Sequence, residues 1–138
     1  MKRGNRRPPA ARMIYAASER CADLLYATGF LAPDPFLWLS VDGQAMAVLS
    51  ELEIGRARKQ MRPGVEVLSH TEAGRRWRIG RRPQGGAVAL AAACAKSCGV
   101  RKWSVPADFP LELARRLARR GVEAEPVREF FPERRRKR

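Results

Sequence analysis

The chain has 138 residues and a mass of 15.5 kDa, which suits one domain that buries about two thirds of its unfolded surface. Hydrophobic residues make up 45% of the sequence and charged residues 30%, a balance that excludes a wholly disordered chain. The formal net charge is +14, from 28 Lys and Arg against 14 Asp and Glu, so binding to nucleic acid or an anionic surface is the first function to weigh.

Much of this charge lies at the two ends of the chain. Five basic side chains fall within residues 1–12, and residues 134–138 are all basic. Blocks of like charge are usually solvated, so we interpret residues 1–12 as a flexible basic tail. The internal arginines lie beside Ala, Gly and Pro, a pattern that genomic base composition alone produces. The net charge is therefore a weak argument for a nucleic-acid partner.

No targeting or membrane segment is evident. The longest apolar run, residues 87–95, is too short to cross a bilayer, and the basic N-terminus lacks the apolar stretch of a signal peptide. Three cysteines, an odd number, do not build a disulfide framework. These features predict a cytoplasmic protein without a membrane partner.

The first elements are a strand and a short helix. Residues 13–17 read as a buried strand, and residues 19–29 as a helix that Gly29 ends, with Leu24 and Leu25 buried. Two apolar runs follow, 36–41 and 46–50. An Asp42-Gly43 pair between them predicts a β-hairpin, because Gly tolerates the positive φ of a tight turn.

The middle of the chain is harder to interpret. Ser50 and Glu53 have the spacing of a capping box, which predicts a helix that runs to about Pro63-Gly64. Residues 65–69 alternate like a strand. Residues 70–86 are rich in Arg and Gly, and we expect mostly loop there.

The last third predicts helix, strand, helix and strand. Residues 87–98 are a buried helix ended by Gly99, in which Cys94 and Cys98 act as small apolar residues. Residues 102–105 form a strand. Asp108 then caps a helix that buries Leu113 and Leu117, and residues 122–127 form an edge strand because they contain Pro126. The whole pattern predicts an α/β fold: a mixed sheet of about six strands with helices on both faces.

No catalytic, cofactor or metal site is evident. Cys94, Cys98 and the single histidine, His70, lack further ligands at suitable spacing for zinc. His70 also lacks a partnered Ser or Cys, and the pair Glu51/Glu53 is explained by capping. Gly85 and Gly86 precede a helix, but the residues of a phosphate-binding loop are missing.

A nucleic-acid interface has one candidate, "GRRWRIGRR" at residues 74–82. Arginines around an exposed Trp77 would neutralise phosphates and stack bases. We favour the alternative, a surface loop whose Trp77 and Ile79 pack inward, because charge runs usually line solvated faces.

A short motif carries a family resemblance. "YATGF" places Tyr26, Thr28, Gly29 and Phe30 at the end of the first helix, before the hairpin. A Glu-containing helix and a strand-helix-strand-helix-strand order follow. This succession, from about residue 13 to 128, resembles the N-terminal domain of the creatinase, prolidase and aminopeptidase P family. Residues 129–138 resemble the start of the linker that leads to that family's pita-bread catalytic domain.

The resemblance implies a non-catalytic accessory domain with a ribonuclease-H-like fold. In the family this domain supports oligomerisation and helps to wall the active-site entrance. Cleavage before proline uses a dinuclear metal centre, often manganese, whose ligands would lie beyond residue 138. We therefore expect this chain alone to be inactive, its parent to be an Xaa-Pro aminopeptidase or dipeptidase, and proline-containing peptides to be bound only by the full protein. The chain would be a domain of that protein, part of a split gene or a truncated reading frame.

Two surface segments are candidates for facing a partner subunit or the active-site entrance. They are the loop 31–36 and the helix segment 51–58, and the residues singled out are Leu31, Asp34, Phe36, Glu51, Glu53 and Arg56. The alternative functions are a small basic RNA- or DNA-binding module, and a creatine-type amidinohydrolase partner domain or degenerate family member.

Overall fold

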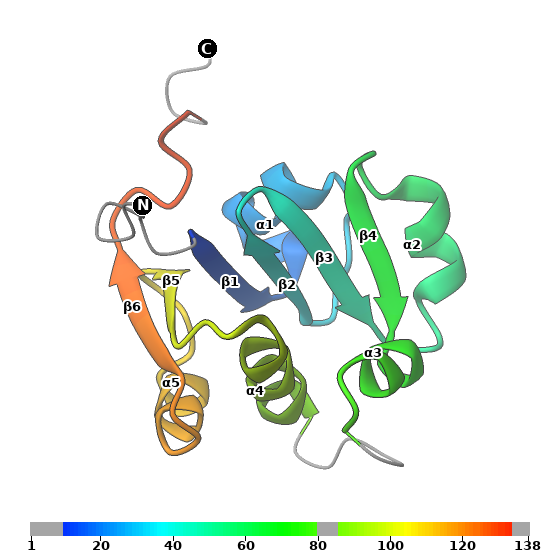
Figure 1. Cartoon of the computed structure of the whole chain (residues 1–138). Coiled ribbons are helices and arrows are strands. Elements are labelled where there is room, and N and C mark those ends of the chain that lie inside the picture. The colour runs from blue at the N-terminus through cyan, green and yellow to red at the C-terminus, as the bar shows by residue number, and fades with distance from the viewer. Residues whose placement is uncertain (1–9, 80–85, 134–138) are drawn as a thin grey trace, which may run out of the picture.

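The computed structural model describes residues 10–79 and 86–133, which form a six-stranded mixed sheet (Figure 1). The strand order is β4-β3-β2-β1-β5-β6. The pairs β1/β2 and β2/β3 are antiparallel, and the other three pairs are parallel. The strands are β1 Ala11–Ala16, β2 Phe36–Val41, β3 Gln44–Leu49, β4 Val65–Ser69, β5 Lys102–Pro106 and β6 Glu123–Val127.

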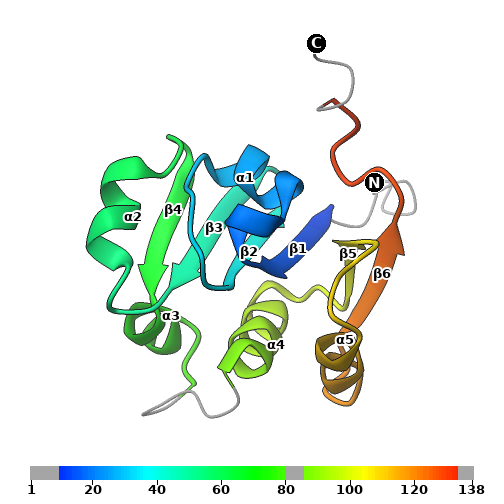
Figure 2. The same ribbon diagram turned by 180° about the vertical axis from the view of Figure 1, so that it is seen from behind.

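Helices cover both faces of this sheet (Figures 1 and 2). One face carries the 3-10 helix η2 (Ser18–Arg20), α1 (Ala22–Thr28) and α2 (Ile54–Gln60), and the other carries α3 (His70–Arg76), α4 (Gly86–Cys98) and α5 (Leu111–Ala118). The predicted α/β class, mixed sheet and two-sided helix cover are confirmed. The ribonuclease-H-like label stays a prediction. No helix in the described ranges combines the length and apolar character that a bilayer crossing requires.

Strand alternation divides the core into two clusters. In β1, Met13 packs toward α4 while Ile14 packs toward α1. In β2, Leu37 and Leu39 join the α3/α4/α5 side, and Phe36 and Trp38 join the α1/α2 side. Successive side chains of a strand point to opposite faces, so continuous apolar runs such as 36–39 occur where both faces are buried.

The predicted hairpin is confirmed. Val41 pairs with Gln44, which leaves Asp42 and Gly43 as a two-residue loop with φ of 50° and 85°. Two positive φ values are the signature of a type I′ turn, which matches the twist of the flanking strands. The Asp42 carboxylate also accepts a hydrogen bond from the backbone N–H of Ala10, at 3.0 Å.

The interpretation of residues 70–86 as mostly loop is wrong, because α3 occupies residues 70–76. Ser69 caps this helix: its hydroxyl accepts from the N–H of Glu72 at 3.0 Å, and the Glu72 carboxylate accepts from the N–H of Ser69 at 2.9 Å. The predicted box at Ser50 and Glu53 is absent, since α2 begins only at Ile54 without a side-chain cap. Both pairs have the same spacing and each follows a strand, but α3 begins directly after Ser69, whereas a turn at residues 51–53 separates Ser50 from α2.

Other predictions need smaller corrections. Asp108 does not cap α5, whose first turn has no side-chain cap. Leu25 is 37% exposed because it lies on the outer side of α1, whereas Leu24 is fully buried. Cys98 is exposed on the last turn of α4, and only Cys94 is buried, where burial and the nearby Cys98 raise the pKa of its thiol. Gly29 and Gly99, which were predicted to end their helices, have positive φ, and so does Gly121 after α5.

The packed region is longer than the predicted 13–128. β1 already includes Ala11 and Arg12, which were assigned to the tail 1–12. At the other end, Phe130 and Phe131 are buried, although residues 129–138 were interpreted as the start of a linker. The predicted tail and linker otherwise fall largely on residues 1–9 and 134–138, outside the described residues.

Replacing the two capping candidates separately distinguishes the real box from the false one. We expect Ser69→Ala to lower the free energy of unfolding by about 1 kcal/mol, because the N–H of Glu72 loses its acceptor. Ser50→Ala is the matched control and should change stability by less than about 0.5 kcal/mol. Urea denaturation measures both, and equal effects would contradict the capping assignment.

Candidate functional site

The Tyr26–Phe30 motif ends α1 and turns the chain into the loop that follows. The Thr28 hydroxyl donates to the carbonyl of Leu24 at 2.9 Å and accepts from the N–H of Phe30 at 3.2 Å. Gly29 has φ of 65°, a conformation that strains residues with a Cβ. Phe30 is fully buried. The motif therefore has a structural role: it stops the helix and anchors the next loop in the core.

Ser18 completes this anchor, and sequence reasoning missed it. Its buried hydroxyl donates to the carbonyl of Phe30 at 2.6 Å and accepts from the N–H of Ala32 at 2.7 Å. The N–H of Glu19 also donates to the carbonyl of Ala32. These bonds join η2 to the loop 31–35. No local pattern marks Ser18, because its partners lie 12 and 14 residues away.

Arg56 brings the motif and the two candidate surface segments together. Its guanidinium donates to the carbonyl of Leu31 at 3.1 Å and to the carboxylate of Glu53 at 2.6 Å. It also lies over the Phe30 ring, 4.6 Å from the ring centroid, in cation–π geometry. Three residues singled out from the sequence (Leu31, Glu53 and Arg56) thus form one cluster, which we call the Arg56 cluster.

The remaining candidates are placed as follows. Asp34 is exposed in the loop, and Leu31 of the cluster is 51% exposed. Phe36 is buried in the core and is therefore unavailable to a partner, because it is the first residue of β2 and points toward α1. Glu51 accepts from the N–H of Thr71 at 3.1 Å, and the Thr71 hydrogen bonds lower the pKa of its carboxyl. Leu52, beside it, is 94% exposed.

A second cluster fastens the C-terminal segment to β1 and β2. The Phe131 ring packs against Tyr26 and Trp38, with centroid distances of 5.2 Å to Tyr26 and 5.7 Å to Trp38. The Phe130 ring packs edge-on against Phe131, with the two centroids 4.8 Å apart. The Arg12 guanidinium lies over the Phe131 ring at 4.7 Å. The motif residue Tyr26 thus contacts the end of the described chain. The family resemblance gave no sign of this contact, because it assigned Tyr26 to the first helix and residues 129–138 to the start of a linker.

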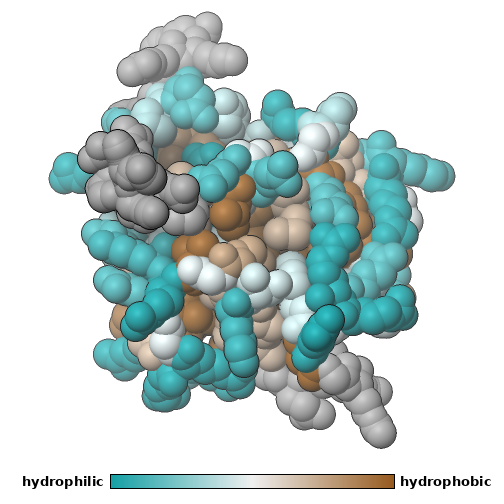
Figure 3. Space-filling model, viewed as in Figure 1, coloured by the Kyte–Doolittle hydropathy of each residue, from teal (hydrophilic) through white to brown (hydrophobic). Residues whose placement is uncertain are grey.

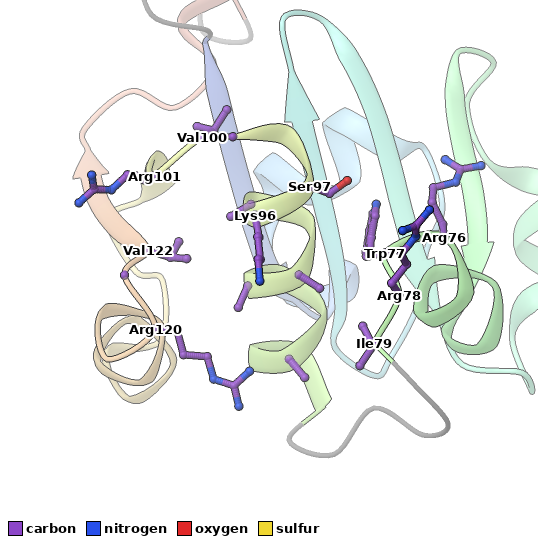
Figure 4. Close-up of a pocket in the computed structure, with 16 residues that line it drawn as sticks. Arg76, Trp77, Arg78, Ile79, Lys96, Ser97, Val100, Arg101, Arg120 and Val122 are labelled. Carbon is purple, nitrogen blue, oxygen red and sulfur yellow. The ribbon is translucent and has the colours of Figure 1, made fainter.

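The basic segment 74–82 is a helix end within the described residues, and its last part, residues 80–82, lies outside them. Trp77 is buried and Ile79 is half-buried, and both pack against α4 side chains in the core, as the favoured interpretation predicted. Trp77 does not offer a free ring face for a base. The basic side chains of this region border a surface groove along α4 (Figure 4).

The described residues do not fit a dinuclear metal centre. No group of three or more His, Cys, Asp or Glu side chains gathers in this part of the chain. His70 is the first residue of α3, where burial lowers the pKa of its imidazole and the nearby Glu51 opposes that shift. The described residues therefore lack the ligand set that a pair of metal ions requires.

Comparison with known proteins gives matches in structure only. No protein-family profile and no curated protein matches the sequence. The fold is similar to an Xaa-Pro dipeptidase from Bacillus anthracis (TM-score 0.67, 16% identity), over 92% of this chain and 31% of that one. It is also similar to an Xaa-Pro aminopeptidase from Streptococcus thermophilus (TM-score 0.67, 9% identity), over 92% of this chain and 85% of that one.

A third match identifies the region. The N-terminal domain of a cytoplasmic peptidase from Mycobacterium tuberculosis is 18% identical, with a TM-score of 0.58, over 87% of this chain and 81% of that one. The chain spans 31% of the length of the B. anthracis dipeptidase and of an X-Pro aminopeptidase from Thermotoga maritima. It therefore has the fold of the N-terminal domain of Xaa-Pro peptidases and is about a third as long as the longer chains.

Removing the Glu51 carboxylate tests its hydrogen bond to α3. The lowered pKa of Glu51 means that its ionised form stabilises the fold at neutral pH, and that this contribution is lost as the pH falls through the lowered pKa. We expect Glu51→Gln to be less stable than the wild type at neutral pH and to approach it well below about pH 4. Urea denaturation at both pH values measures this. The control Leu52→Ala should change the free energy of unfolding by the same amount at both pH values. If the effect of Glu51→Gln were also independent of pH, the hydrogen bond from Thr71 would not depend on the ionised Glu51 carboxylate.

Truncating Phe131 tests whether the C-terminal segment is part of the fold. Phe131→Ala removes a buried ring, and we expect a loss of about 3–5 kcal/mol in the free energy of unfolding. Leu111→Ala, at a 65% exposed position, should change it by less than about 0.5 kcal/mol. If Phe131→Ala were as mild as the control, residues 130–131 would not belong to the core in solution.

Proposed function

We propose that this chain is a non-catalytic N-terminal accessory domain of an Xaa-Pro metallopeptidase of the aminopeptidase P and prolidase kind. The observation that carries the proposal is the likeness in fold to the N-terminal domain from M. tuberculosis, over 87% of this chain. The motif at Tyr26, Thr28, Gly29 and Phe30 supports it, because these residues build the turn that positions the Arg56 cluster.

The surface that would serve this role includes the Arg56 cluster and its neighbours. Arg56 holds the carbonyl of Leu31, so the loop 31–35 is fixed against α2 while the Leu31 side chain remains exposed. Leu31 and Leu52 are large apolar side chains in solvent, and a subunit contact at this surface would bury them. Asp34, Glu51 and Glu53 supply charge around them. In the proposal this surface contacts a second subunit or borders the active-site entrance of the assembled enzyme.

Catalysis, in this proposal, belongs to a separate pita-bread domain. That domain would carry the dinuclear metal centre, with manganese the expected metal, and would bind proline-containing peptides. The match of this chain to about a third of two longer peptidase chains supports such a division. The similar domain from M. tuberculosis belongs to a cytoplasmic peptidase, which supports a cytoplasmic location here.

A nucleic-acid-binding module is the second candidate. The observation that favours it is a set of basic side chains along one groove: Arg78, Lys96, Arg101 and Arg120 make no ion pair with any other described residue. The burial of Trp77 removes the stacking platform on which this function partly rested. The accessory-domain role is therefore the better-supported function.

Two measurements test the proposal. The chain alone, with manganese and Xaa-Pro dipeptides, should show no turnover above that of the metal in buffer. Light scattering should show self-association that Leu31→Asp weakens at least about tenfold, because an apolar contact worth about 1.5–3 kcal/mol is replaced by a buried charge.

Leu111→Asp, on α5 and on the opposite face, is the control and should not change self-association. Turnover that depends on the chain would overturn the accessory role. A monomer at all concentrations, or equal effects of the two variants, would overturn the proposed contact surface.

A further inference from the structure

A broad groove runs along α4 on the face opposite to the Arg56 cluster. Its volume is about 1090 Å³, at the upper end of ordinary ligand pockets. Helix α4 forms its floor, the end of α3 one wall, and the segment between α5 and β6 the other (Figure 4). The groove is thus built by elements of one rigid face of the sheet.

The floor of the groove is apolar and low. Ala89, Ala92 and Ala93 of α4 have only a methyl side chain, so the helix surface lies below its neighbours. Ile79, Val100 and Val122 extend this surface on the two sides. In the space-filling view, pale and brown atoms occupy the middle of the face, with teal side chains on both sides (Figure 3). Such a floor favours the burial of apolar side chains.

The border of the groove is positively charged. Arg120 reaches toward α4 from one side, Arg78 lies on the other, and Lys96 lies between them on α4 (Figure 4). None of the three makes an ion pair within the described part of the chain, and no Asp or Glu lines the groove. The nearby Arg76 is different, because the Glu66 carboxylate binds it at 2.6 Å.

Arg78 stands where a glycine is usual. The N–H of Ile79 donates to the carbonyl of Gly74 at 2.9 Å, and the N–H of Arg78 to that of Arg75 at 3.3 Å, which is the Schellman pattern at a helix end. The residue in the left-handed conformation is Arg78, with φ of 53°. A non-glycine residue there costs about 1 kcal/mol. This backbone conformation places a cation on the wall of the groove.

The occupant of a cationic groove must be acidic. Residues 1–9, 80–85 and 134–138, the only parts of the chain outside the structure, contain no Asp or Glu. The same groove of a second copy carries the same basic border, so two copies repel each other at this face. Charge complementarity therefore selects a different molecule.

The apolar floor distinguishes between two acidic partners. A nucleic acid would gain from the basic border, but it would find no exposed aromatic ring in the groove to stack on, since Trp77 is buried. An amphipathic helix would use both features, with apolar side chains on the alanine floor and carboxylates beside Arg78, Lys96 and Arg120.

We propose that the α4 groove is a docking site for an acidic amphipathic helix of a partner protein. The helix lies along α4 with its apolar stripe on Ala92 and Ala93, and its carboxylates pair with Arg78, Lys96 and Arg120. This site is on the other face of the sheet from the Arg56 cluster and does not depend on the proposed peptidase role.

The test uses a fluorescent synthetic peptide of about 15 residues, with leucines at helical spacing and flanking glutamates. A scrambled peptide of the same composition and a single-stranded RNA are the competing probes. Fluorescence anisotropy at physiological salt should show the amphipathic peptide binding at least about tenfold more tightly than the scrambled one. Binding should weaken as salt is raised.

Variants separate docking from folding. Arg78→Gly relieves the left-handed strain, so it should be at least as stable as the wild type in urea while binding the peptide several-fold more weakly. Lys96→Glu/Arg120→Glu should weaken binding at least about tenfold. Lys59→Glu/Arg116→Glu makes the same change in net charge outside the groove and should leave affinity within about twofold of the wild type.

Three results would overturn the proposal. One is equal binding of the amphipathic and scrambled peptides, since the apolar floor would then contribute nothing. Another is an equal loss of affinity in the two double variants, which would show that only net charge attracts the peptide. The third is RNA bound more tightly than the amphipathic peptide in a manner that Lys96→Glu/Arg120→Glu abolishes, which would assign the groove to nucleic acid instead.

Discussion

The central strands β1 and β2 must be buried on both faces, and most of the structure follows from this requirement. Met13 and Ile14 are adjacent in sequence but pack into different cores, and the same is true of Leu37 and Trp38. A sheet with two apolar faces needs a cover on each side. Helices α1 and α2 cover one face and α3, α4 and α5 the other. The α1/α2 cover leaves the Trp38 region to be closed by Phe130 and Phe131, with Arg12 over their rings. The C-terminal segment therefore completes the cover of this face of the sheet.

Elements whose signals are local could be predicted from the sequence. The turn at Asp42 and Gly43, and the helix ends at Gly29 and Gly99, each depend on a backbone conformation that few residues adopt. Helix α3 could not be predicted in this way, because most of its residues are polar and its sequence shows no apolar periodicity. Only Ala73 and Trp77 pack it against the sheet. Its capping box at Ser69 was visible, but so was an equivalent pair at Ser50 that the fold does not use. Only tertiary context separates two such pairs.

In the candidate site, too, local features could be predicted from the sequence and contacts between distant residues could not. The motif was recognised, and the segments 31–36 and 51–58 were each named as candidates for facing a partner, but their contact through Arg56 with Leu31, Glu53 and the Phe30 ring was not predicted. Phe36 was misplaced, because the strand start turns it inward. Ser18 and Arg12 act through partners distant in sequence, so nothing local marks them. The groove could not be predicted once residues 70–86 were interpreted as loop, since one of its walls is the end of α3.

The position of β1 has a consequence for how the chain folds. β1 precedes the other five described strands and its antiparallel partner β2 follows it directly, but its parallel partner β5 comes only after β3 and β4. During synthesis on the ribosome, the unit β1–β4 with α1 and α2 can pair while one edge of β1 remains open. Arg12 and Ser104 then form a contact of long sequence separation, which is slow because a long loop must close first. The open edge of β1 is apolar on both faces, so this interval is the one in which a nascent chain would need protection from aggregation.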